Sequence, residues 1–123
     1  MARASLRISI LITGFWAASA SADNCADLPQ TEMNICAEAN WERADAHINL
    51  TYQRLLKKLK APEKTQLRDA QVAWLKYRDL ACELNASAVA GGSMQPTVRY
   101  ACLERITKHR DEELEDTLEL FGI

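Results

Sequence analysis

The residues from Ala70 to Cys82 form one uninterrupted helical pattern that contains neither glycine nor proline. Apolar side chains recur here at steps of three and four, the spacing that gathers them on one face of an α-helix. We expect that face to comprise Leu67, Ala70, Trp74, Tyr77, Ala81 and Leu84. The pattern ends on a cysteine, so one segment offers both an aromatic anchor for a core and a sulfur atom for a covalent link. The rest of the chain is expected to be organised around this helix.

Two further segments show the same spacing, so the chain is predicted to be an all-α, antiparallel three-helix bundle. The expected helices run from an N-cap at Thr31 to about Leu59, from the Ala61-Pro62 break to about Leu84, and from Pro96 to about Leu120. A proline is tolerated in the first helical turn but not in a helix interior, which places the second helix start at this break. Because the break is short, the first two helices are expected to be antiparallel neighbours.

The first 22 residues have the pattern of a secretory signal peptide. Arg3 and Arg7 precede an apolar run, and Ala20-Ser21-Ala22 has the small residues of a cleavage site. The run is shorter than the roughly 20 apolar residues that span a bilayer, so no stable membrane insertion is expected after cleavage. We therefore predict residues 1–22 as the signal peptide and residues 23–123 as one exported domain, located in the periplasm or outside the cell.

The net charge limits the kinds of partner that this domain can bind. It is −2 for the whole chain and becomes −4 when Arg3 and Arg7 leave with the signal peptide. A mildly acidic protein is poorly suited to nucleic acid or to an anionic membrane. The charge is instead compatible with a cationic protein partner.

All four cysteines, Cys25, Cys36, Cys82 and Cys102, follow the predicted cleavage site. An even number of cysteines in an exported domain predicts two disulfides. The alternative is a zinc site, but the chain has no C-x-x-C pair and neither histidine stands at ligand spacing from a cysteine. We expect no metal and no cofactor. The helix order gathers the cysteines at one pole of the bundle, and all three possible pairings remain open.

Four polar residues close to the expected apolar faces form a candidate polar cluster: Asp45, Asn49, Gln71 and Arg78. We expect an Asp45–Arg78 pair that sets the register of the first two helices. The alternative is a catalytic carboxylate at Asp45 in a small hydrolase. Such an enzyme needs a second carboxylate in a cleft, for which a bundle of this size has little room. The chain is therefore not expected to be an enzyme.

Two surface features are candidates for contact with a partner. The segment from Asn85 to Gln95 is the long irregular stretch of the chain and carries Gly91, Gly92 and Ser93; it is either a functional loop or a solvated connector. The second half of the third helix is rich in carboxylates, including Glu112, Glu115 and Asp116. These carboxylates either pair with the lysines near the first helix break or form an acidic binding surface.

The mature chain resembles the N-terminal domain of the LprI-type lysozyme inhibitors, a bacterial secreted family. The resemblance rests on Met33-Asn34-Ile35-Cys36-Ala37, Ala44-Asp45, Ile48-Asn49, Tyr52, Ala70-Gln71, Trp74, Tyr77-Arg78-Asp79, Cys82, Gly92-Ser93, Cys102 and the Thr107, Arg110, Leu114 spacing. It covers nearly all of residues 25–115 and implies a disulfide-bonded helical domain that binds and inhibits lysozyme.

The resemblance supplies no inhibitory residues, so the contact candidates come from the two surface features above. A loop that contains Gly91, Gly92 and Ser93 could enter the cleft of an enzyme and inhibit it by steric occlusion. The acidic residues Glu112, Glu115 and Asp116 could face a basic lysozyme. The alternative function is a periplasmic scaffold or adaptor that binds another envelope protein.

Overall fold

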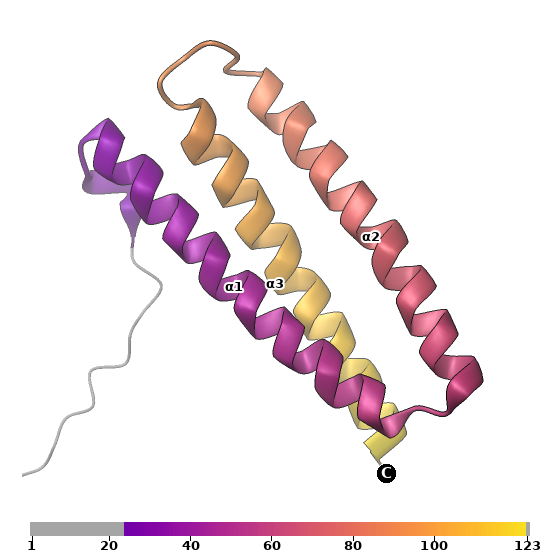
Figure 1. The fold of residues 1–123 in the computed structure, drawn as a ribbon. Helices are drawn as coiled ribbons and strands as arrows, with labels where there is room; N and C mark the ends of the chain where they lie inside the picture. Colours follow the sequence, from indigo (N-terminus) through magenta and orange to yellow (C-terminus); the bar gives the residue numbers. More distant parts are fainter. Residues whose placement is uncertain (1–23, 123) are drawn as a thin grey trace, which may run out of the picture.

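A computed structural model describes residues 24–122 and shows a bundle of three long α-helices (Figure 1). A short 3-10 helix, η1, spans Cys25–Asp27, and the three helices are α1 (Gln30–Lys58), α2 (Ala61–Ser87) and α3 (Gln95–Gly122). Helices α1 and α3 run in the same direction and α2 runs opposite to both. No strand occurs among residues 24–122, and the predicted all-α antiparallel fold is confirmed. The predicted signal peptide lies outside the described residues.

The helix ends differ from the expected ones by a few residues. Helix α1 begins one residue before Thr31, because Pro29 stands at its N-cap and its carbonyl accepts a bond of 2.8 Å from the Met33 amide. The expectation that Thr31 is the N-cap was wrong. Helix α2 begins at the predicted break, with Pro62 in its first turn, but continues three residues beyond Leu84. The connection that follows is therefore shorter than the expected irregular segment and consists of residues 88–94.

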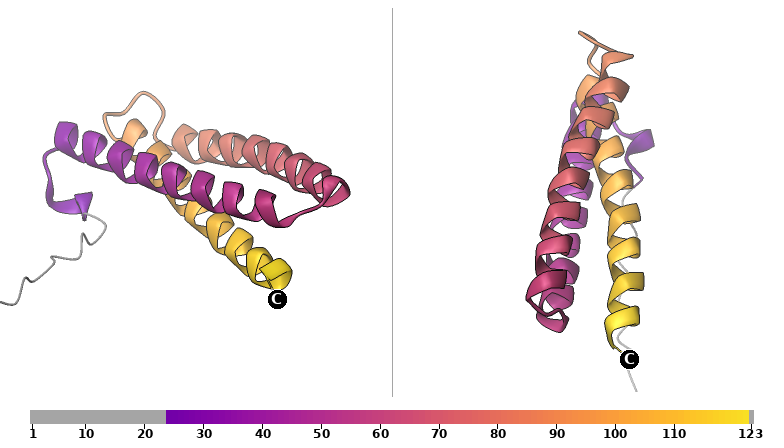
Figure 2. Two further views of the ribbon diagram at one scale, coloured as in Figure 1. Left: turned by 60° about the horizontal axis from the view of Figure 1, so that its bottom comes forward. Right: turned by 90° about the vertical axis from the view of Figure 1, so that its right-hand side faces the viewer.

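Helix α3 holds the bundle together. It packs closely along both α1 and α2, whereas the backbones of α1 and α2 come close at hardly any point. Figure 2 shows α3 leaning across the pair formed by the other two helices. The first two helices are antiparallel as expected, but they are joined chiefly through α3 and through long side chains such as Trp74, which packs against the core. The expectation of direct neighbours was too simple.

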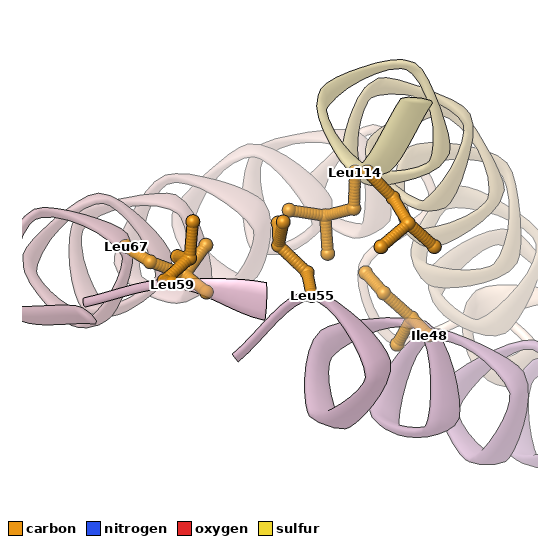
Figure 3. Packing of buried hydrophobic residues seen from close by; sticks show 6 residues of the cluster. Ile48, Leu55, Leu59, Leu67 and Leu114 are labelled. Carbon is orange, nitrogen blue, oxygen red and sulfur yellow. The ribbon is translucent and has the colours of Figure 1, made fainter. Parts of the chain in front are cut away.

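The main core lies in the half of the bundle that contains the α1–α2 connection. Its buried members are Ile48, Leu55, Leu59, Leu67, Leu114 and Leu118 (Figure 3). All three helices and the connection contribute to this cluster. Burial of one such leucine side chain contributes about 1.5–3 kcal/mol to folding.

The face of α2 that is turned toward the core differs from the predicted one. Leu67 is buried, but Ala70, Tyr77 and Leu84 are exposed. The buried residues nearer the end of the helix are Arg78, Cys82 and Ala86, at steps of four. The spacing of apolar residues could not predict this face, because a search for apolar residues does not count an arginine. Arg78 is nevertheless buried, between aromatic rings.

Two disulfides link Cys25 to Cys36 and Cys82 to Cys102. The prediction of two disulfides is confirmed, and the structure resolves the pairing that the sequence left open. The first bond ties η1 to the start of α1, and the second joins the end of α2 to the start of α3. Closing a chain segment of the length between Cys82 and Cys102 stabilises the folded state by about 3 kcal/mol in the chain-entropy model.

Within residues 24–122, no helix combines the length and the apolar character that crossing a membrane requires.

Leu55 and Leu50 allow a matched test of the core. Leu55 is fully buried and Leu50, on the same helix, is 66% exposed. We expect Leu55→Ala to lower the free energy of unfolding by about 2–5 kcal/mol, because it leaves a cavity in the core. Leu50→Ala should change it by less than about 0.5 kcal/mol. Urea denaturation followed by circular dichroism measures both values, and equal effects would contradict this description of the core.

Candidate functional site

The connection between α2 and α3 is a compact turn with exposed residues at its tip. Successive backbone bonds organise it, including those from the Gly92 amide to the Val89 carbonyl (3.0 Å) and from the Gln95 amide to the Gly92 carbonyl (3.2 Å). Gly91 adopts a φ of +75°, a left-handed conformation that glycine adopts without a steric penalty. Gly91, Gly92 and Ser93 are all exposed at the tip.

This connection is fastened to the rest of the bundle on two sides. The Cys82–Cys102 disulfide crosses its base, where α2 ends and α3 begins. The Asn34 side chain on α1 donates a bond of 3.3 Å to the Ser93 carbonyl. Asn34 also accepts a bond from Thr97 on α3. The tip is therefore exposed, and its base is tied to the bundle.

Aromatic packing supports the same pole from below. The rings of Trp41 and Tyr100 are stacked with centroids 5.7 Å apart. The Tyr100 hydroxyl donates a bond of 3.0 Å to Glu38, and this bond to a carboxylate raises the pKa of Tyr100. The pair links α1 to the first turns of α3 beside the disulfide of Cys82.

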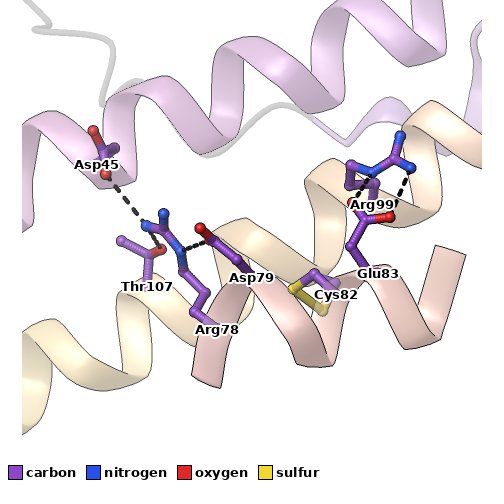
Figure 4. A network of polar contacts seen from close by, with 8 residues as sticks. Asp45, Arg78, Asp79, Cys82, Glu83, Arg99 and Thr107 are labelled. Carbon is purple, nitrogen blue, oxygen red and sulfur yellow. Dashed lines mark hydrogen bonds and ion pairs between the residues drawn. A yellow bond between two sulfur atoms is a disulfide. The ribbon is translucent and has the colours of Figure 1, made fainter. Parts of the chain in front are cut away.

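The predicted polar cluster centres on Arg78, whose side chain is only 8% exposed. Its guanidinium donates to Asp45 on α1 (3.4 Å), to Asp79 on its own helix (3.0 Å) and to Thr107 on α3 (3.4 Å), as Figure 4 shows. It also lies over the rings of Trp74 and Trp41, with its central carbon 5.1 and 5.9 Å from their centroids. Arg78 thus contacts all three helices at once.

The other two members of the predicted cluster make other contacts. Gln71 accepts a bond of 3.3 Å from Arg110 on α3. Asn49 is exposed and lines a groove of about 390 Å³ between α1 and α2, together with Asp45, Gln71 and Trp74. The Asp45 carboxylate, the candidate for hydrolytic chemistry, is paired with Arg78. The Asp45–Arg78 pair therefore joins α1 to α2.

The acidic residues of α3 are divided between two environments. Glu115 accepts bonds from Arg54 (2.8 Å) and Thr51 (3.1 Å) on α1. Glu112 and Asp116 are exposed on the outer side of the helix. In the described part of the chain, no ion pair joins α3 to the lysines around the α1–α2 connection. Asp111 and Glu115 pair with α1, whereas Glu112 and Glu113 pair with residues of α3 itself.

The loop tip and the acidic residues lie far apart. Ser93 precedes α3 and Glu112 lies in its second half, a separation of about 25–30 Å at 1.5 Å per helical residue. An interface of ordinary size covers about 800 Å² on each partner, a patch of comparable diameter. A partner centred on the loop would therefore reach the acidic residues only at the edge of its contact area.

The described residues hold no cluster of three or more histidine, cysteine, aspartate or glutamate side chains with the arrangement of a metal site. His47 lies 2.5 Å from Asp111 across the α1–α3 contact, and His109 lies on the same helix as its partners Glu112 and Glu113. Both histidines thus lie beside carboxylates at the surface.

These features define a small helical bundle with two disulfides at one pole and a constrained, exposed loop at that pole. The chain belongs to the family of the lysozyme inhibitor LprI, which matches residues 21–114. The protein is thus lysozyme-inhibitor-like, and the resemblance noted in the sequence is confirmed. Export is consistent with this family and with the two disulfides.

The chain is also similar to an uncharacterized protein of Rhizobium meliloti (strain 1021). The two are 35% identical over an alignment that covers 73% of this chain and 74% of the relative. No solved structure matches the chain.

Sequence reasoning missed several residues that position the site. The bond from Asn34 to the Ser93 carbonyl joins residues 59 apart in the chain. The fully buried Thr107 accepts a bond from Arg78, although its residue type is usually exposed. For Thr107, a polar residue at a core position of its helix was the available signal.

Arg78 and Asp79 provide a test of the polar cluster. We expect Arg78→Ala to lower the free energy of unfolding by about 2–4 kcal/mol, because it leaves a cavity between two tryptophan rings and removes the polar contacts to α1 and α3. Arg78→Lys should recover only part of this loss, since an ammonium group lacks the planar surface that stacks on tryptophan. Asp79→Asn should cost less than about 1 kcal/mol, because the Asp79 side chain is 62% exposed. Urea denaturation measures all three, and wild-type stability in Arg78→Ala would contradict this role.

Proposed function

We propose that the protein is exported and inhibits a lysozyme by occluding its substrate cleft with the loop at residues 88–94. The observation that carries the proposal is the state of this loop, which is exposed at its tip and restrained at its base by the Cys82–Cys102 disulfide. Membership of an inhibitor family supports a protein partner of this kind. No chemical step on the lysozyme is required.

A restrained loop is well suited to this task for a thermodynamic reason. Ordering a flexible loop on binding costs free energy, and a loop already held in its bound shape avoids most of that cost. The backbone bonds within the turn and the bond from Asn34 to the Ser93 carbonyl provide this restraint. Gly91 and Gly92 have no side chains, so the backbone at the tip can approach the walls of a narrow cleft closely.

The acidic surface has a different part in the proposal. Glu112 and Asp116 are too far from the loop to enter the same cleft, but they are exposed and negative. We infer that they attract a basic lysozyme over a distance and raise the rate of association. Such steering acts mainly on the association rate and weakens with added salt.

The alternative function is an adaptor that binds another protein of the cell envelope through a helical face. The exposed apolar residues Tyr77, Leu80 and Leu84 on α2 are the observation that favours it. The two functions differ in where binding energy resides. If the protein is an inhibitor, changes at the loop should abolish the inhibition of lysozyme. If it is an adaptor, the same changes should leave binding of its partner unchanged.

A lysis assay with matched variants tests the loop. The oxidised mature protein is added to a cell-wall suspension with a c-type lysozyme, and we expect dose-dependent inhibition that disappears when the disulfides are reduced. Ser93→Trp should weaken inhibition at least tenfold, because a large side chain at the tip prevents entry into the cleft. Thr65→Trp places the same side chain at an exposed hydroxyl position near the other pole and should leave inhibition unchanged.

Inhibition by Ser93→Trp at the wild-type concentration would rule out the loop as the occluding element. Absence of inhibition by the wild-type protein at high micromolar concentration would rule out a c-type lysozyme as the target. Circular dichroism of each variant verifies that the helices are intact.

A second experiment tests electrostatic steering. Glu112→Gln with Asp116→Asn should slow association with a basic lysozyme several-fold at low salt and leave the dissociation rate unchanged. Glu42→Gln with Asp69→Asn removes the same charge from exposed positions farther along α1 and on α2 and should have a smaller effect. Surface plasmon resonance at several salt concentrations measures both rates. Equal slowing by the two double variants would show that net charge, not this surface, sets the rate.

A further inference from the structure

The outer face of α2 carries apolar residues that the bundle leaves uncovered. Tyr77 and Leu80 are each 62% exposed, and Leu84 is 72% exposed. Together with the exposed Ala73, these residues follow the steps of four, three and four that make a seam in paired helices. We call Ala73, Tyr77, Leu80 and Leu84 the α2 seam.

The α2 seam differs from the other exposed apolar side chains of the helices. The other apolar side chains that are more than 60% exposed are Ile35 and Leu50 on α1, Val72 on α2 and Leu120 on α3. Ile35 and Leu50 stand 15 residues apart, Val72 does not follow the spacing of the seam, and Leu120 lies near the end of α3. Isolated apolar residues on a surface are ordinary, whereas a contiguous apolar set indicates an interaction surface. The orientation of α2 is itself constrained, because Arg78 and Cys82 are buried on the opposite side of the helix.

We propose that the α2 seam is the site at which two copies of this chain associate, with their α2 helices antiparallel. A two-fold axis between residues 78 and 79 would place Tyr77 of one copy against Leu80 of the other, twice. Ala73 would then lie against Leu84 of the other copy. An interface of this kind is self-complementary, as a closed two-fold dimer requires.

The charges that flank the seam support this occupant and this register. Lys76 and Glu83 lie seven residues apart along one edge of the seam. Residues at the edges of such a seam form ion pairs between the two helices. In the proposed register Lys76 of each copy lies beside Glu83 of the other. Glu83 already accepts two bonds from Arg99 of its own chain (2.8 and 3.3 Å), so in the dimer its carboxylate is shared between Arg99 and Lys76 of the other copy.

The other arrangements of two α2 helices are disfavoured by the same charges. A shift of seven residues in one direction brings Glu83 beside Glu83 of the other copy, and a shift in the other direction brings Lys76 beside Lys76. A parallel arrangement places Lys76 beside an alanine and forms no ion pair. Opposed like charges therefore select the antiparallel register with Tyr77 against Leu80.

The proposed contact is a single pair of helices with four apolar residues on each side. Such an interface falls at the low end of the size range for specific complexes, so we expect a dissociation constant of roughly 10–100 µM. Association is therefore expected to be reversible and to depend on concentration.

Analytical ultracentrifugation of the oxidised protein across this concentration range tests the proposal. We expect the wild-type protein to shift from monomer to dimer, and Leu80→Glu to weaken self-association at least tenfold. Leu50→Glu is the matched control, since Leu50 is a similarly exposed leucine on α1, and it should associate like the wild type. A wild-type protein that remains monomeric, or equal effects of the two variants, would overturn the proposal.

Charge reversal tests the register. Lys76→Glu and Glu83→Lys should each weaken self-association several-fold, because each variant opposes like charges twice in the dimer. The double variant Lys76→Glu/Glu83→Lys should recover it, and an equimolar mixture of the two single variants should form a heterodimer. A mixture that associates no better than either single variant would overturn the antiparallel register. Lysozyme inhibition measured on the same samples keeps this result separate from the proposed function.

Discussion

The buried guanidinium of Arg78 is the interaction on which the arrangement of the three helices depends. Because the backbones of α1 and α2 rarely approach each other, α2 needs side chains that reach across the space between them. Arg78 does so, with polar contacts to Asp45 on α1 and to Thr107 on α3 and with its flat surface over two tryptophan rings. A buried charge is tolerated only with partners, and these partners come from all three helices. The same contact determines which face of α2 is turned outward.

The two ends of the bundle are stabilised in different ways. A cluster of leucine and isoleucine side chains forms the core near the α1–α2 connection, where no disulfide occurs among the described residues. The opposite pole has the disulfides and the stacked Trp41 and Tyr100. Covalent and aromatic contacts at this pole support the base of the loop and leave its tip exposed. This is the condition that a rigid element of an inhibitor needs, and it is consistent with the family to which the chain belongs.

Much of the fold could be predicted from local patterns. Helical periodicity, the Pro62 break and the even number of cysteines predicted three helices and two disulfides, because each of these signals acts over a few residues or through a count. Of the candidate site, the exposed glycine tip and the closeness of Asp45 to Arg78 were expected from spacing. The anchoring of Ser93 by Asn34 was not, since it joins residues that only the packing of α1 beside α3 brings together.

The sequence by itself determined that the chain is a helical bundle with two disulfides, and it contained the motifs of the LprI family. Only the tertiary structure decided the cysteine pairing and the orientation of α2. An apolar repeat ranks faces by hydrophobicity alone, so Tyr77 and Leu84 were expected inside and Arg78 beside the core. Two tryptophans, an aspartate and a threonine together made burial of the arginine favourable. Those partners lie on three helices, so their combined effect exists only once the helices have packed.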